Sequence, residues 1–199
     1  MTSRFVQREG KRRRSSPTMR QIVAEPRASV AGDDPVRYTS TPLEPVPIRR
    51  VAVSAHLLRL DVDAARVLLL RRSSGDFLAG EWCQVSGRIE AGETAWQAAL
   101  REIREETGLA PERFYSADAC EQFYEPTRNS ISLLPVFVGF VSAHAVVTLN
   151  AEHSEARWMT FAEAEAAVTF GGQRSVLAHV RREFVDRQPT EWLRIRIEP

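Results

Sequence analysis

The sequence predicts one α/β (α+β) domain built around a mixed sheet. Segments rich in Val, Leu and Ile alternate with segments of helical periodicity, and no regular repeat interrupts them. Hydrophobic residues make up 43% of the 199 residues and charged residues 27%, which is ordinary for a globular protein and enough to fill one core. Together the predicted elements place strands on both sides of helices.

The strands are predicted from β-branched and aliphatic runs bounded by turn residues. Residues 48–60 and 65–72 are separated by Asp61-Val62-Asp63 and are predicted to pair with each other. Residues 82–86 form a short strand that leads into a glycine. Further strands are expected at about 114–124, 131–142, 156–160 and 192–197.

Three helices are predicted between and after these strands. The first covers 94–107, because Thr94 and Gln97 have capping-box spacing at its start and Gly108 can take the left-handed position at its end. The others are expected at 161–168 and at about 173–186.

Residues 1–47 are predicted to be a basic, Pro-rich tail, either disordered or extended, with the folded domain occupying 48–199. The tail has few large apolar residues and a proline series. Residues 1–30 hold eight basic and two acidic side chains, a net charge of +6, so the rest of the chain carries −5. A tail of this charge is compatible with binding a phosphate backbone.

Composition excludes several classes of protein. The formal net charge is only +1, so the molecule as a whole does not indicate nucleic-acid binding. No run approaches the roughly 18 apolar residues needed to cross a bilayer, and no apolar secretion signal is present near the start. Two cysteines do not make a disulfide framework. We therefore expect a cytoplasmic protein, with no membrane partner and with a homodimer possible.

The most informative stretch runs from Gly87 to Leu109. Glu102, Glu105 and Glu106 are three and four positions apart, so a helix places their carboxylates on one face. Like charges at this spacing repel, whereas Arg101, four residues before Glu105, can restrain one of them. The opposite face is apolar, which indicates that the helix packs against a sheet.

Clustered carboxylates suit a hard divalent cation, and Mg²⁺ prefers a few carboxylates together with waters and substrate phosphates. Mn²⁺ is a possible substitute. Such an ion neutralises phosphate charge and lowers the pKa of bound water. The plain alternative is an acidic helix exposed to solvent, but Gly87, Glu93 and Gly108 stand in register with the glutamates and disfavour it.

This stretch resembles the Nudix box at every defined position. The matching residues are Gly87, Glu93, Arg101, Glu102, Ile103, Glu105, Glu106, Gly108 and Leu109. The resemblance to the Nudix hydrolase family implies an α/β/α sandwich with a mixed sheet. It also implies that Glu102, Glu105 and Glu106 bind metal, that the Gly87 carbonyl adds a ligand, that Arg101 orients a glutamate, and that Glu93 supports the loop. Ser86 departs from the family, because many members carry a second glycine there.

Residues outside the box are assigned by the same resemblance. The segment Glu152-His153-Ser154-Glu155 looks like the family's Glu-His segment, and Glu152 is the first choice for an additional metal ligand or general base, with Glu155 second. His153 is expected to be a surface loop residue. Substrate binding is expected of Arg72 and Glu155, and phosphate binding of Arg128 or Arg174.

The resemblance also sets a preferred substrate. Residues 82–87, Glu152-His153 and Gly172-Gln173-Arg174 resemble bacterial pyrophosphohydrolases acting on dATP or dihydroneopterin triphosphate. We therefore expect a nucleotide-like triphosphate to be cleaved to a monophosphate and pyrophosphate. The alternatives are a dinucleoside polyphosphate or nucleotide-sugar pyrophosphatase, an RNA-directed enzyme that uses the Arg-rich tail, and a non-catalytic Nudix-like binding module. The complete set of box carboxylates disfavours the last.

Overall fold

The computed structural model describes residues 45–75 and 78–197. The chain divides into two units, Met1–Leu43 and Glu44–Pro199, and all of the described residues belong to the second. The tail predicted over 1–47 lies, as far as residue 44, outside the described residues.

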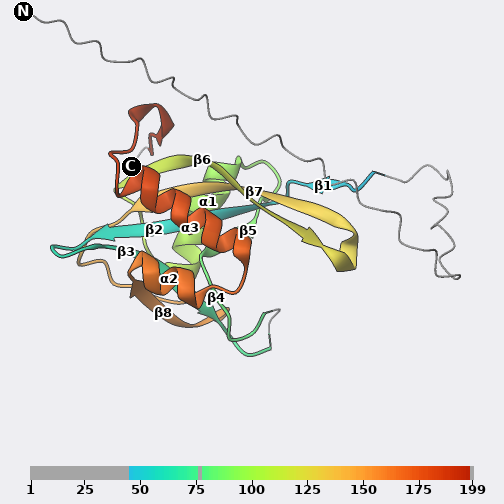
Figure 1. Ribbon diagram of the computed structural model, residues 1–199, viewed down its shortest axis with the longest axis horizontal. Coiled ribbons are helices and arrows are strands. Elements are labelled where there is room, and N and C mark those ends of the chain that lie inside the picture. Colours follow the sequence, from blue (N-terminus) through green and yellow to red (C-terminus); the bar gives the residue numbers. More distant parts are fainter. Residues whose placement is uncertain (1–44, 76–77, 198–199) are drawn as a thin grey trace, which may run out of the picture. The chain divides into compact units, whose positions relative to one another are not determined.

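A mixed sheet forms the centre of this unit (Figure 1). Its principal strand order is β4-β3-β2-β7-β6-β9, with β1 joined to β7, β5 to β2 and β8 to β3. The strands are β1 Ile48–Arg49, β2 Ala52–Leu60, β3 Ala65–Arg72, β4 Trp82–Cys83, β5 Val85–Arg88, β6 Arg113–Glu125, β7 Ser130–Phe140, β8 His153–Met159 and β9 Arg194–Ile195. Strand β2 pairs parallel with β7 and antiparallel with β3 and β5, so the sheet is mixed as predicted.

The sheet is covered on both faces, because side chains of a strand point alternately to opposite sides. In β3, Val67 and Leu69 pack into the core beneath helices α2 (Phe161–Ala167) and α3 (Gly171–Phe184). Leu68 and Leu70 pack into a second core, with helix α1 (Ala95–Thr107). Figure 1 accordingly shows α1 behind the sheet and α2 and α3 in front of it. The predicted α/β/α sandwich is confirmed.

The two ends of α1 follow the sequence prediction closely. The Thr94 backbone N–H donates to the Gln97 side-chain oxygen at 2.8 Å. Gly108 has φ 67° and its N–H donates to the Arg104 carbonyl at 2.9 Å. The polar residue before the helix and the glycine after it therefore define its length.

The strand predicted over residues 48–60 is interrupted in the structure. Residues 48–60 were expected to form one strand, but the structure divides them into β1 and β2, with Arg50 and Val51 between. Both strands pair parallel with β7, and the register changes by one residue between Ile48↔Ile131 and Ser54↔Val136. The extra residue cannot enter the ladder, so the strand is interrupted there.

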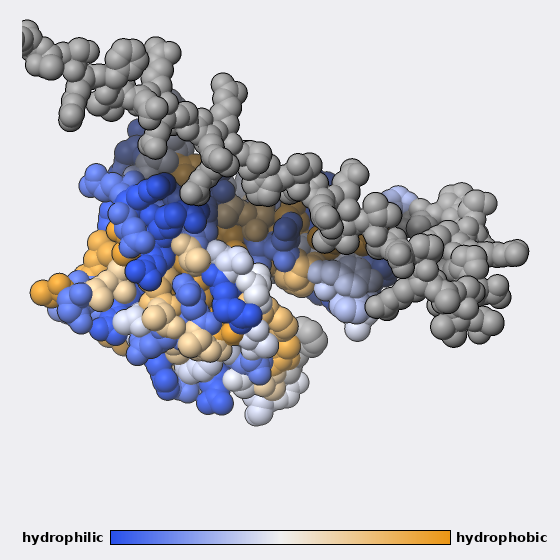
Figure 2. Space-filling model, in the orientation of Figure 1, coloured by the Kyte–Doolittle hydropathy of each residue, from blue (hydrophilic) through white to orange (hydrophobic). Residues whose placement is uncertain are grey.

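A second predicted strand, 82–86, is likewise divided at Gln84 into β4, which pairs with β3, and β5, which pairs with β2. The remaining elements differ from prediction mainly at their ends. Strand β7 stops at Phe140 rather than at 142, and α3 runs from Gly171 to Phe184 rather than from 173 to 186. Residues 192–197 contain a short 3₁₀ turn, Glu191–Leu193, followed by the two-residue β9. Among the described residues no helix is both long and apolar enough to cross a membrane. Hydrophilic residues lie beside smaller apolar patches on the face shown in Figure 2.

Candidate functional site

Gly87, in β5 just before the loop that leads to α1, lies beneath the carboxylate of Glu102. A Cβ atom placed on Gly87 would lie 1.9 Å from the Glu102 carboxyl carbon, so only glycine leaves room for this side chain. Gly87 is held in β5 by its pairing with Val53 in β2. The first and the central positions of the motif therefore meet in space, although they are 15 positions apart in the sequence.

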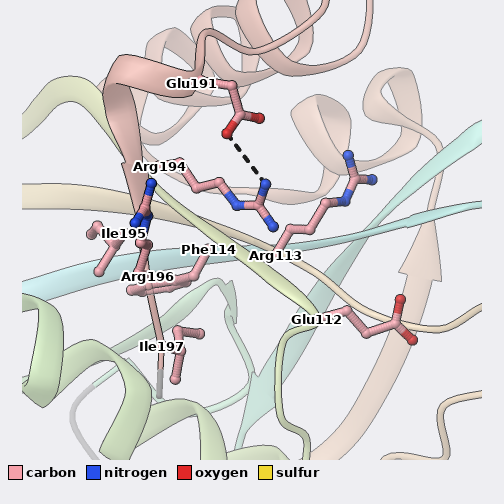
Figure 3. Close-up of a pocket in the computed structure, with 8 residues that line it drawn as sticks. All are labelled: Glu112, Arg113, Phe114, Glu191, Arg194, Ile195, Arg196 and Ile197. Atoms are coloured by element: carbon pink, nitrogen blue, oxygen red, sulfur yellow. Dashed lines mark hydrogen bonds and ion pairs between the residues drawn. The ribbon is translucent and has the colours of Figure 1, made fainter. Parts of the chain in front are cut away.

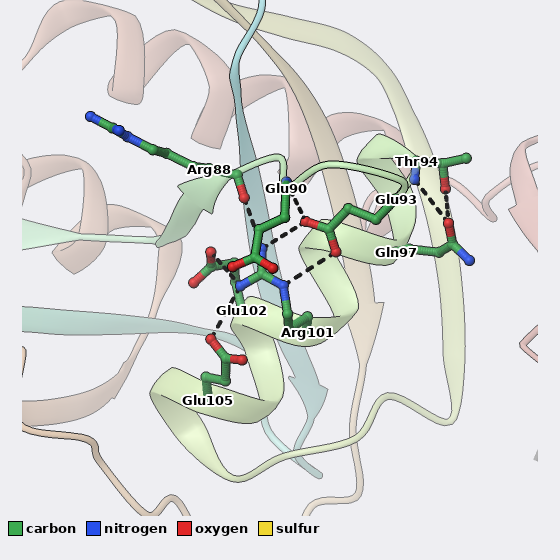
Figure 4. Close-up of polar contacts among 8 residues, drawn as sticks. All are labelled: Arg88, Glu90, Glu93, Thr94, Gln97, Arg101, Glu102 and Glu105. Carbon is green, nitrogen blue, oxygen red and sulfur yellow. Dashed lines mark hydrogen bonds and ion pairs between the residues drawn. The ribbon is translucent and has the colours of Figure 1, made fainter.

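Arg101 ties this loop to the acidic face of α1 (Figure 4). Its guanidinium donates to both carboxylate oxygens of Glu93, at 3.2 and 2.8 Å, and to the Arg88 carbonyl at 2.8 Å. It also donates to Glu102 at 2.8 Å and to Glu105 at 3.1 Å. One planar cation thus fixes a loop carboxylate and two helix carboxylates at the same time.

Glu93 is held in its ionised form by these contacts. The hydrogen bonds from Arg101 lower its pKa, and the backbone N–H of Glu90, 2.7 Å from its carboxylate, lowers it further. The ionised Glu93 side chain therefore holds the loop against the helix through its contacts with Arg101 and with the Glu90 backbone. This geometry agrees with the supporting role expected for Glu93.

Glu106 is the most buried carboxylate of the motif, with 3% of its surface exposed. Burial, followed by the charges of Glu102 and Glu152, raises its pKa to about 8, although a hydrogen bond from the Ser86 backbone and the charge of Arg72 oppose this rise. Its Oε2 atom has no hydrogen-bond partner among the described residues. A buried carboxylate with an unpartnered oxygen is costly unless another group compensates it.

Glu102 shares this environment. Burial raises its pKa most, the hydrogen bond from Arg101 lowers it, and the charges of Glu105 and Glu152 raise it again. The charges of Glu105 and Glu152 thus act on Glu102, and those of Glu102 and Glu152 act on Glu106. Oxygen ligands of this kind suit Mg²⁺ or Mn²⁺, and the unpartnered oxygen of Glu106 gives a cation a direct point of contact.

As they stand, the side chains do not form a finished coordination sphere. Within residues 45–75 and 78–197, no group of three or more His, Cys, Asp or Glu side chains is placed to hold one ion. Glu102 and Glu105 are both turned toward Arg101. For several of the motif glutamates to coordinate one ion, their flexible side chains would have to rotate, while the backbone of α1 stays in place.

The structure separates the two candidates outside the motif. Glu152 lies in the turn before β8, where its charge raises the pKa of both Glu102 and Glu106. Glu155 instead forms ion pairs with Arg157 at 2.6 Å and with Arg71 at 3.6 Å. Glu152 is therefore the carboxylate that the fold brings to the motif.

Of the basic residues expected to bind substrate, Arg72 lies closest to the acidic cluster. It is the last residue of β3, and its charge lowers the pKa of Glu106. Arg128 lies in the turn between β6 and β7 and pairs with Glu125. Arg174 donates to the carbonyls of Val168 and Thr169, each at 3.1 Å, and so closes the turn before α3.

His153 is not a surface residue, which corrects the expectation from its sequence context. It is the first residue of β8 and is 5% exposed, and its Nε2 lies 3.9 Å from the Cys83 sulfur. Burial raises the pKa of Cys83 to about 11, so this thiol stays protonated and is a packing residue rather than a nucleophile. Neither cysteine forms a disulfide.

Sequence reasoning missed a second group of buried polar residues. Gln84, Glu121 and Gln173 are joined by hydrogen bonds and come from three separate parts of the fold. The available signal was weak: Glu121 stands in a strand two residues after the partly buried Ala119, at the position where alternation predicts an inward side chain.

A hollow of about 380 Å³ lies away from the motif, between the start of β6 and the C-terminal strand (Figure 3). Its lining includes Arg113, Arg194 and Arg196, and Arg194 is paired there with Glu191. None of the motif glutamates contributes to it.

The layered fold and the strand–loop–helix unit with its glutamates define a Nudix-type α/β/α domain. The NUDIX domain model matches residues 48–183, which is more than half of the chain. The chain belongs to the NUDIX domain family. The resemblance stated from the motif is thereby confirmed.

Individual relatives match parts of the chain. The octanoyltransferase of Myxococcus xanthus is 34% identical over 139 residues, covering 67% of this chain and 36% of that protein. The dihydroneopterin triphosphate diphosphatase of Escherichia coli K12 is 53% identical over 48 residues, covering 24% of this chain and 29% of that protein. The chain thus spans about a third of the length of each of these curated relatives.

Among solved structures, the Ap4A hydrolase of Caenorhabditis elegans in a binary complex superposes with a TM-score of 0.59. It is 21% identical, and the match covers 71% of this chain and 99% of that chain. At this identity the comparison establishes the fold.

Proposed function

We propose that this protein is a Mg²⁺-dependent hydrolase that cleaves a phosphoanhydride bond of a nucleoside triphosphate-like substrate, releasing pyrophosphate and a monophosphate. One observation carries the proposal: Glu106 is buried beside Glu102 and Glu152, its pKa is raised to about 8, and one of its oxygens lacks a partner. Without a cation, such a carboxyl is held protonated near neutral pH, and a bound cation would instead stabilise its ionised form.

Glu102, Glu105, Glu106 and Glu152 are the residues that would hold the cation, with the Gly87 carbonyl as a further oxygen ligand. When bound, a divalent cation neutralises phosphate charge and lowers the pKa of water at the site. Mn²⁺ has the same preference for oxygen and would substitute. Membership of the NUDIX family supports the use of a divalent metal.

The remaining residues position the reacting groups. Arg101 holds Glu102 and Glu105 in the direction set by the loop, through its contacts with Glu93 and Arg88. Arg72 presents a positive charge beside the acidic cluster, where it can bind a substrate phosphate. Glu152 is the carboxylate best placed to accept a proton from the attacking water.

The preference for a triphosphate is supported by the likeness to dihydroneopterin triphosphate diphosphatase, which is restricted to 48 residues. The reaction products therefore distinguish the three classes of substrate. A nucleotide or pterin triphosphate cleaved as proposed yields pyrophosphate, a dinucleoside polyphosphate yields two nucleotides, and a nucleotide sugar yields a sugar phosphate.

The decisive experiment is a Mg²⁺-supplemented screen of nucleotide and pterin triphosphates beside dinucleoside polyphosphates, with Glu106→Gln assayed in parallel. We expect turnover with release of pyrophosphate, and at least a 10²-fold lower kcat in the variant, because it loses the buried charge that holds the metal. Glu165→Gln, the same substitution in α2 on the opposite face of the sheet, is the matched control. Near-normal turnover by Glu106→Gln would refute this site.

A further inference from the structure

Three buried polar side chains form a chain of hydrogen bonds on the α3 side of the sheet. Gln173 Nε2 donates to Gln84 Oε1 at 3.2 Å, and Gln84 Nε2 donates to Glu121 Oε2 at 2.8 Å. They are 7%, 5% and 6% exposed, respectively. Gln84 lies between β4 and β5, Glu121 in β6 and Gln173 in the first turn of α3. None of the three is used by the metal site.

Two further buried polar residues share this face of β2. Ser54 lies beside Glu121 and lowers the pKa of that carboxyl, while burial raises it more strongly. His56 is two residues further along β2, so its side chain points to the same face. It is 1% exposed, and neither ring nitrogen has a hydrogen-bond partner in the described part of the chain. Buried polar atoms without a partner, such as the ring nitrogens of His56 in this polar patch, are uncommon in a core and need an explanation beyond packing.

Exposed aromatic rings lie at the edge of this patch. Phe123 is two residues from Glu121 on β6, on the same face, and is 45% exposed. Phe170 is 47% exposed and its backbone N–H donates to Gln173 Oε1 at 3.2 Å. Strand β6 and the start of α3 lie close together, because a Cβ on Gly172 would be 3.5 Å from the Gln122 carbonyl. Aromatic faces beside hydrogen-bonding groups are suited to stacking and edge recognition of a heterocyclic base.

The patch also lies at a suitable distance from the acidic site. Gln84 precedes Gly87 by three residues in an extended segment, and a strand rises by about 3.3 Å per residue. The two residues are therefore about 10 Å apart along the chain. The two groups approach each other at the break between β4 and β5, because the charges of Glu106 and Glu121 both act on Cys83, the residue before Gln84. A nucleotide with its phosphates at the glutamates can therefore extend its ring past this break toward Gln84.

The hydrogen-bonding pattern selects one kind of ring. Gln84 donates to one carboxylate oxygen of Glu121, Oε2, and a carboxylate has further lone pairs with which to accept from a ligand. A 2-amino-4-oxopyrimidine edge, present in guanine and in pterins, offers adjacent N–H donors, whereas adenine offers one donor and one acceptor. Donated hydrogen bonds would also compensate the buried charge of Glu121.

We propose that Gln84, Glu121 and Gln173 recognise the heterocyclic ring of the substrate, and that Glu121 selects a ring with a 2-amino-4-oxopyrimidine edge. This inference rests on the proposed function, since it assigns the ring whose phosphates the acidic site would cleave. It names a specificity residue 15 positions beyond the last glutamate of the motif, in a different strand.

The test measures binding of GMP, IMP and AMP to the full chain by NMR titration in the presence of EDTA. IMP differs from GMP only in lacking the 2-amino group. We expect GMP to bind at least tenfold more tightly than IMP or AMP. Glu121→Gln should reduce the ratio of the affinity for GMP to the affinity for IMP below three. Glu125→Gln, the same substitution further along β6, should leave this ratio of affinities unchanged. Equal binding of the three nucleotides, or an unchanged ratio in Glu121→Gln, would overturn the proposal.

A second variant guards against loss of folding in Glu121→Gln. Phe170→Ala removes an exposed ring and leaves the buried chain intact, so GMP and IMP should both bind at least fivefold more weakly with the same ratio. Unaltered affinities for GMP and IMP in Phe170→Ala would show that the base of the nucleotide binds elsewhere. Because neither metal nor bond cleavage is involved, a protein that selects GMP but hydrolyses no triphosphate would refute only the proposed function. A hydrolase indifferent to Glu121→Gln would refute only this inference.

Discussion

Glu102 lies over Gly87 with no space between them: a Cβ on Gly87 would be 1.9 Å from the Glu102 carboxyl carbon. The contact explains why a residue without a side chain is needed at the end of a strand, where glycine otherwise weakens pairing. It also couples the backbone of β5 to the direction of a carboxylate on α1. Substitutions of Gly87 and of Glu102 should therefore both act by changing the position of the Glu102 carboxylate.

Gly87→Ala should push the Glu102 carboxylate away and raise the Mg²⁺ concentration for half-maximal activity at least tenfold. The measurement is a Mg²⁺ titration of turnover for wild type, Gly87→Ala, Glu102→Ala and the double variant. If the glycine acts through Glu102, the two effects will be strongly non-additive. Full additivity would show that the methyl group perturbs something else.

Arg101→Lys should lower the free energy of unfolding by about 1–2 kcal/mol, because lysine keeps the charge but cannot donate to Glu93, Arg88 and the helix glutamates together. Urea unfolding measures this change. Arg104→Lys, on an exposed position of the same helix, should change stability by less than about 0.5 kcal/mol. Equal effects of the two substitutions would contradict the bracing role of Arg101.

The metal-free protein should lose stability as pH rises. The folded-state pKa of Glu106 is about 8, against 4.5 when unfolded, so its contribution is complete below 4.5 and is lost as pH approaches 8. Between pH 6 and pH 9 the loss should be about 2–3 kcal/mol for this carboxyl. Urea unfolding in EDTA at both pH values tests it, and Glu106→Gln should lack this component. An equal pH dependence in the variant would mean that another group is responsible.

Glu152→Gln and Glu155→Gln form a matched pair, three residues apart. The first should reduce kcat at least tenfold, because the charge of Glu152 acts on Glu102 and Glu106. The second should change kcat less than threefold, since Glu155 pairs with Arg157 and Arg71. The reverse order of effects would transfer the role to Glu155. Steady-state kinetics with the substrate found in the screen decides between them.

The local features of the motif could be predicted from the sequence. The spacing of Glu102, Glu105 and Glu106 places them on one face of α1, and Gly108 ends that helix as expected. These relations depend on residues three or four positions apart, whose geometry is fixed by helical hydrogen bonding. The continuous aliphatic run over residues 65–72 likewise predicted a strand, and β3 occupies those residues.

Relations between distant segments were decided only by the tertiary structure. It determined that Glu152, and not Glu155, approaches the glutamates, that His153 is buried, and that Gln84, Glu121 and Gln173 meet. A sequence reports which side chains share a face of one element, but not which elements pack together or how deeply. Burial and long-range electrostatics arise from that packing, so the raised pKa of Glu106 and the polar patch beneath α3 have no local signature.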